Sequence, residues 1–80
     1  MPIPASIQPS EFKRFLEAYG YTQQHETEYN WTLLKENSAL PVIVINKIRE
    51  LVEIEIMMGI LNKLEMNDGE YLRLLSQIKN

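Results

Sequence analysis

The stretch YNWTLLKENSALPVIVIN, residues 29–46, decides the fold class of this chain. In its first part Tyr29, Trp31 and Leu33 alternate with polar residues, which is typical of a half-buried strand. The segment KENSALP that follows is rich in turn-forming residues and leads into VIVIN. A continuous β-branched run of this kind predicts a strand near the middle of a sheet. The stretch therefore predicts two strands joined by a short connection.

Residues 23–27, QQHET, precede this stretch and are the more polar partner expected for its first strand. The connections between the three segments are short, and short connections favour antiparallel pairing. We therefore expect a three-stranded antiparallel sheet. Because residues 42–45 carry apolar side chains toward both faces of that sheet, the face without helices should be covered by self-association or by a partner protein.

A helix is predicted upstream, in PSEFKRFLEAYGY, where Phe12, Phe15, Leu16 and Tyr19 recur at helical spacing. Pro9 or Ser10 suits its start. Gly20 suits its end, because glycine adopts the left-handed conformation that closes many helices.

The period changes to that of a helix after Asn46. The expected apolar stripe comprises Ile54, Met57, Met58, Leu61 and Leu64. VEIEI, residues 52–56, also fits an alternating strand, but the helix is the better interpretation. Its upstream limit is left open, because Ile48, Leu51 and Val52 would allow one or two further turns.

A last helix is predicted from its capping residues. Asn67 suits the N-cap, Glu70 can reach back to it, and Met66 can pack on Tyr71. The expected apolar face comprises Tyr71, Leu74, Leu75 and Ile78. The full order is α-β-β-β-α-α, an α+β fold with a three-stranded antiparallel sheet packed against helices.

Composition limits the function further. Eighty residues suffice for one small domain, placed at residues 9–80 after an extended segment at 1–8. No cysteine occurs, which suits a cytoplasmic setting. The longest apolar run is too short to cross a membrane. With a single histidine, no metal site or cofactor is expected. Eleven acidic against eight basic side chains give a net charge of -3, which disfavours RNA as a ligand.

The segments EFKRFLEAYGY and MMGILNKLEMNDGEYLRLL resemble parts of the HicA family of small toxins, also called YcfA-like. EFKRFLEAYGY is similar to the opening helix of that family, which ends in a Gly-aromatic pair, here Gly20 and Tyr21. MMGILNKLEMNDGEYLRLL is similar to its closing section, and PVIVIN lies where the family has its third strand. The resemblance implies a fold like that of double-stranded-RNA-binding domains. It also implies a ribonuclease that cleaves messenger RNA and is neutralised by a HicB-type antitoxin.

The active histidine of that family follows a Gly-Ser pair at the first strand turn, which corresponds to HETEYNW, residues 25–31, in this chain. If Trp31 matches the aromatic residue that follows the family's histidines, Glu28 and Tyr29 occupy the histidine positions. Imidazole suits a general base at neutral pH. A carboxylate beside Glu26 would repel the phosphate it must approach. The catalytic candidates are therefore only His25 and Glu28, each of which also fits an exposed position on a strand.

Lys13, Arg14, Tyr29 and Trp31 are the candidates for a partner or RNA surface. The aromatic pair could stack on bases or belong to the core, and the basic pair could be the exposed side of the first helix.

Three hypotheses about function follow. The first is a HicA-like domain that lacks nuclease activity and acts through protein contacts. The second is an active or divergent toxin held by a HicB-type antitoxin, and the third is a passive binder of double-stranded RNA.

Overall fold

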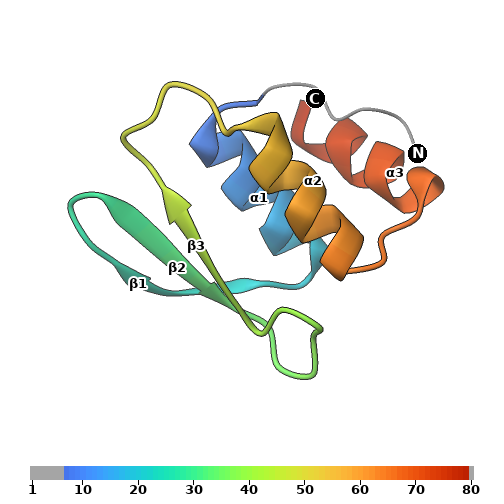
Figure 1. The fold of residues 1–80 in the computed structure, drawn as a ribbon, viewed down its shortest axis with the longest axis horizontal. Coiled ribbons are helices and arrows are strands. Elements are labelled where there is room, and N and C mark those ends of the chain that lie inside the picture. The colour runs from blue at the N-terminus through green and yellow to red at the C-terminus, as the bar shows by residue number, and fades with distance from the viewer. Residues whose placement is uncertain (1–6, 80) are drawn as a thin grey trace.

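The computed structural model describes residues 7–79, with side chains for residues 7–77. The element order is α1 (Pro9–Tyr19), β1 (Thr22–Glu26), β2 (Asn30–Leu34), β3 (Val42–Asn46), α2 (Ile54–Lys63) and α3 (Asp68–Lys79). This order confirms the predicted α+β fold. The three helices lie on one side of the sheet, with α3 the farthest from it (Figure 1). Of the extended segment predicted at 1–8, only Ile7 and Gln8 fall within the described residues, and Ile7 is buried.

The sheet is antiparallel in the order β1-β2-β3, with consecutive strands adjacent. This order contradicts one expectation, because β3 lies at an edge and not near the middle. The β-branched run misled the prediction, since apolar side chains on both faces are typical of a central strand. Leu33 pairs with Ile43 and is fully buried, whereas the neighbouring pair of Thr32 and Val44 faces away from the helices.

α1 begins at Pro9, one of the two predicted starts. The backbone N–H of Gln8 donates to the Glu11 carboxylate over 2.9 Å, which satisfies a group that has no partner inside the helix. Gly20 ends the helix with a φ of 121°. The N–H of Tyr21 then donates back to Leu16 over 3.0 Å. This closure turns the chain directly into β1 and leaves Tyr21 buried.

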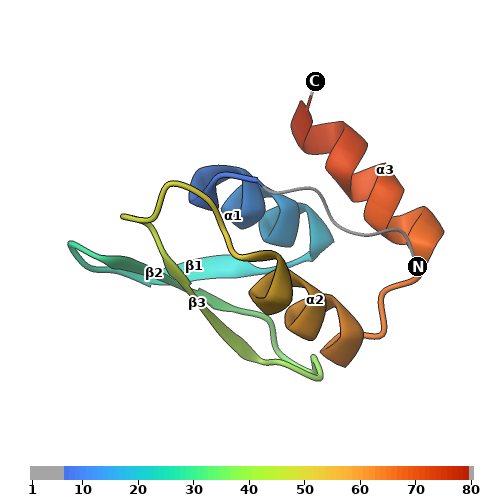
Figure 2. The ribbon, with the colours of Figure 1, turned by 45° about the horizontal axis from the view of Figure 1, so that its top comes forward.

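The core lies between the covered face of the sheet and the helices. Phe15 of α1 contacts Tyr71 of α3 with ring centroids 5.7 Å apart, so α3 packs mainly on α1 and forms an outer layer (Figure 2). The most deeply buried large side chains are Ile7, Phe12, Phe15, Leu16, Leu33, Met57, Leu61 and Leu74.

α2 begins at Ile54, which settles the limit that the sequence left open. Val52 is buried and its N–H donates to the carbonyl of Ile7 over 2.8 Å. Of the predicted stripe, Met57, Leu61 and Leu64 are buried and Met58 is half-buried. Ile54 was expected to belong to the core but is exposed, at the first residue of α2.

α3 starts as its capping residues predicted. The side-chain oxygen of Asn67 accepts a hydrogen bond of 2.8 Å from the N–H of Glu70. Tyr71 and Leu74 are buried and Leu75 is half-buried, whereas the side chain of Ile78 lies outside the described residues. Met66, just before the cap, is also buried.

Candidate functional site

HETEYNW forms the tip of the β1–β2 hairpin. A register shift between Gln23 and His25 marks a β-bulge in β1, after which His25 pairs with Thr32. Paired residues share a face of the sheet, so His25 lies on the open face, and its side chain is exposed. Within residues 7–79 it has no hydrogen bond or ion pair. Nothing in this part of the chain orients the ring, as a general base requires.

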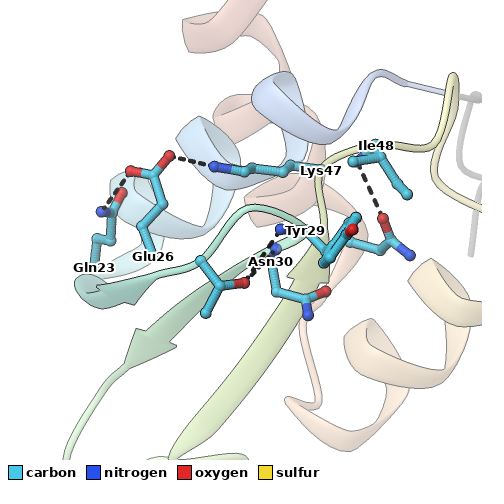
Figure 3. Close-up of polar contacts among 8 residues, drawn as sticks. Gln23, Glu26, Tyr29, Asn30, Lys47 and Ile48 are labelled. Carbon is cyan, nitrogen blue, oxygen red and sulfur yellow. Dashed lines mark hydrogen bonds and ion pairs between the residues drawn. The ribbon is translucent and has the colours of Figure 1, made fainter.

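Thr27 organises the hairpin turn that contains Tyr29 and Asn30, both labelled in Figure 3. Its hydroxyl oxygen accepts hydrogen bonds from the N–H groups of Tyr29 over 3.2 Å and Asn30 over 3.0 Å. Glu28 and Tyr29 are therefore exposed turn residues. This corrects the expectation that Tyr29 begins the strand alternation and that Glu28 lies on a strand. A threonine hydroxyl that bonds the backbone two and three residues on ends the extended pattern before β2 starts.

Trp31 lies on the covered face, half-buried against the core. The Nζ of Lys13 lies 5.0 Å from its ring centroid and that of Lys47 lies 5.6 Å away, both within the range of cation–π attraction. Lys47 also forms an ion pair with Glu26. This ion pair lowers the pKa of the Glu26 carboxyl group, with a smaller contribution from a Trp31 hydrogen bond. These four residues, Lys13, Glu26, Trp31 and Lys47, which we call the clamp, join α1, β1, β2 and the segment that follows β3.

The predicted surface candidates are thus only partly brought together. Lys13 and Trp31 meet in the clamp, whereas Arg14 is exposed on α1 and Tyr29 stands in the turn, 53% exposed. An indole that contacts the core and two ammonium groups leaves little free ring surface for stacking on a base. These residues do not form one aromatic and basic platform.

No group of three or more His, Asp or Glu side chains within residues 7–79 is arranged to hold a metal ion. Of the helices described, none has the length and apolar content needed to cross a membrane.

The free edge of β3 is the second notable region. The N–H of Lys47 donates to the carbonyl of Tyr29 over 2.9 Å, directly beyond the last strand pair. Bonded pairs alternate along an antiparallel ladder, so the odd-numbered residues of β3 bond to β2. The N–H and C=O groups of Val42 and Val44 therefore point outward at the sheet edge. Their side chains are 53% and 58% exposed.

Apolar side chains continue from this edge into α2. Eight large apolar residues are exposed among the side chains of residues 7–77. Six of them lie within residues 42–56, and we call them the 42–56 surface: Val42, Val44, Ile48, Leu51, Ile54 and Ile56. A groove of about 110 Å³ runs between β3 and α2, lined by Val44, Leu51 and Ile56 among others. Exposed apolar patches on small proteins mark interaction sites.

Sequence reasoning identified the apolar valines of β3 but missed Leu51 and Ile56. A signal for them exists, because both are apolar and lie outside the stripe that α2 buries. Residues 48–56 carry more apolar side chains than one helix face can bury, and this surplus predicts an exposed patch.

In comparisons with known proteins, no family model matched the chain. Neither a curated protein nor a solved structure matched it significantly.

Proposed function

We propose that this chain is a non-catalytic protein-binding domain, whose partner adds an extended segment to the free edge of β3. The observation that carries the proposal is the outward-pointing backbone of Val42 and Val44 beside an apolar groove. In binding by strand addition, main-chain hydrogen bonds supply affinity and pockets for alternate side chains supply specificity. The edge of β3 supplies main-chain hydrogen-bonding groups, and the groove supplies a pocket for a side chain.

The lack of protection at this edge supports the proposal. Natural proteins protect edge strands with charges, prolines or covering segments because an open edge invites pairing with another chain. β3 reads VIVIN and has no charged residue. Arg49 and Glu53, which pair with each other, flank the groove instead of the strand. A polar rim around an apolar centre is typical of protein interfaces.

The resemblance to HicA toxins gives the proposal its family context. The order α-β-β-β-α-α agrees with the resemblance, and Glu28 and Tyr29 occupy the family's histidine positions if Trp31 matches the aromatic residue that follows them. We therefore regard the chain as a degenerate relative of messenger-RNA-cleaving toxins, with a HicB-type antitoxin as the partner. Such a partner would place the chain in the cytoplasm.

The positions of the two catalytic candidates favour a binding function over catalysis. His25 lies on the open face of β1 and Glu28 in the hairpin turn, both exposed. A general base acts through a fixed position close to the proton it removes. Neither side chain has a hydrogen bond or ion pair within residues 7–79 that would fix it. The alternative of an active toxin predicts cleavage of RNA, so it is tested directly.

The first experiment incubates RNA with the purified chain and with its His25→Ala and Glu28→Ala variants at neutral pH. We expect the three proteins to leave the RNA intact to the same extent. Cleavage by the original chain that one substitution abolishes would overturn the non-catalytic assignment. The two variants also reveal a contaminating nuclease, because contamination would cleave equally in all three samples.

The second experiment compares Val44→Pro with Val44→Thr in binding to the candidate antitoxin partner. Proline removes the outward N–H, and an edge strand tolerates proline where that group faces solvent. Threonine keeps the N–H and the β-branched shape. We expect Val44→Pro to lose binding and Val44→Thr to keep it, with both variants folded by circular dichroism. Equal binding by both would contradict strand addition at β3.

A further inference from the structure

The outer side of α2 carries a second apolar surface, distinct from the buried side of that helix. Five residues make it up, and we call them the α2 seam: Glu55, Ile56, Gly59, Ile60 and Lys63. Together with Leu40 they line one shallow hollow. Ile56 is 50% exposed and Ile60 is half-buried, so the hollow has an apolar floor with a charged residue at each end.

Gly59 at the centre of the seam is unexplained by the isolated chain. It lies inside the helix, where glycine is less favourable than alanine. A Cβ atom added there would meet nothing within 4 Å, so no contact of the described chain requires its absence. A helical glycine of this kind is useful where the backbone of another helix approaches closely, as small residues permit at helix interfaces.

The charges of the seam are arranged symmetrically about this glycine. Glu55 lies four residues before Gly59 and Lys63 four residues after it, about 6 Å along the axis in each direction. Both side chains are exposed, and neither has an ion pair within residues 7–79. An antiparallel copy of the same helix, crossed at Gly59, would place Lys63 of one chain opposite Glu55 of the other, twice.

We propose that the chain forms a symmetric dimer in which α2 packs antiparallel against α2 of a second copy, with the two-fold axis at Gly59. Two-fold interfaces use the same patch on both subunits and must be self-complementary. The seam meets this condition, because each acidic end faces a basic end and the isoleucines cover each other. The complementarity of the charges and the open space at Gly59 favour a second copy over an unrelated partner.

The dimer is tested separately from the function proposed above. Strand addition depends on the backbone edge of β3 and on the groove beside it, which shares Ile56 with the seam, whereas the charges and the glycine of the seam belong to α2 alone. Val44→Pro should therefore leave dimerisation unchanged. A single ten-residue helix buries less surface than the interfaces of stable dimers, so we expect an equilibrium that shifts to monomer on dilution.

The decisive test uses charge reversal and mixing. Glu55→Lys and Lys63→Glu should each be monomeric in sedimentation velocity at concentrations where the original chain is dimeric, because like charges would face each other across the seam. Mixed together, the two variants should form a heterodimer, since each then supplies the charges that the other lacks. A variant carrying both substitutions should regain the homodimer. Glu17→Lys, an exposed reversal on α1, is the matched control and should remain dimeric.

Two outcomes would overturn the proposal. One is an original chain that stays monomeric at its highest soluble concentration. The other is a mixture of the two reversed variants that stays monomeric although each variant is folded. Substitution of Gly59 adds an independent arm. Gly59→Ala should stabilise the helix and raise the thermal midpoint at monomeric concentrations, yet weaken the dimer, whereas a merely structural glycine would not give these opposite effects.

Discussion

The two faces of the sheet use similar residues for opposite purposes. On β3, Ile43 and Ile45 point toward the helices and are about 5% and 4% exposed, whereas Val42 and Val44 point away and are more than half exposed. All four are β-branched and apolar. Residue type alone therefore does not decide burial in this strand, because the helices stand on only one side (Figure 2).

The difference assigns stability to the covered face, and it leaves the valines of the open face beside the edge at which we propose that a partner binds. Burial of an apolar side chain contributes to folding only where neighbouring atoms replace water. The valines of the open face keep most of their surface in water, so they add little to the stability of the monomer. Their apolar surface becomes useful when another chain covers it, as we propose for the edge of β3.

The strongest test of the difference between the two faces is to truncate neighbouring residues that point to opposite faces. Ile45→Ala should lower the free energy of unfolding by about 2–5 kcal/mol, because it leaves a cavity among packed side chains. Val44→Ala should change it by about 0.5 kcal/mol or less, as is usual for exposed positions. Urea denaturation of both variants gives the two values. Similar losses at both positions would contradict the distinction between the faces.

The turn at Gly20, which connects α1 to β1, should be the next most sensitive position for stability. Gly20 has a φ of 121°, and an added Cβ would lie 3.0 Å from Cε of Lys35. Gly20→Ala should therefore cost about 1–2 kcal/mol through backbone strain, measured by urea denaturation. Ala18→Gly, on the exposed side of the same helix, is a control that changes helix propensity without this strain. An unchanged stability of Gly20→Ala would show that the turn relaxes freely.

A smaller loss of stability is expected at the start of α3, the outer layer of the fold. Asn67→Ala removes the side-chain acceptor for the N–H of Glu70 and should cost about 1 kcal/mol. Asn67→Asp keeps an acceptor and should retain most of the stability. Thermal unfolding followed by circular dichroism compares the three proteins. If the aspartate variant lost as much as the alanine variant, the cap would not be the cause.

Much of the fold follows from local patterns in the sequence. The stripe of Phe12, Phe15 and Leu16 and the helix-ending Gly20 define α1, and Asn67 defines the start of α3, because each depends on neighbours within a few residues. The place of β3 in the sheet does not follow in this way. Its residues fit a central strand equally well, and only the positions of the helices and of the other strands put it at the edge.

The candidate site was harder to predict for a related reason. The direction of His25 depends on a bulge of one residue in β1, and a shift of one residue moves a side chain to the other face. The exposure of Tyr29 depends on two hydrogen bonds to Thr27. Both are turn or register effects that periodicity does not encode. Ile56 differs, because it lies outside the predicted stripe of α2 and its exposure could have been inferred from the sequence.

The smallest expected change in stability concerns the ion pair of Glu26 and Lys47 beside Trp31, at the rim of the covered face. The pair lowers the pKa of the Glu26 carboxyl group, so the folded state favours its ionised form. The stability from this pair should be complete above the ordinary pKa of a glutamate and should disappear as the pH falls through the lowered value. Glu26→Gln should thus be slightly less stable than the original chain at pH 7 and equal to it in acid.

Thermal midpoints across this pH range test the prediction, and added salt should reduce the difference because the pair is exposed to solvent. A difference that persisted in acid would point to packing of the side chain and not to its charge.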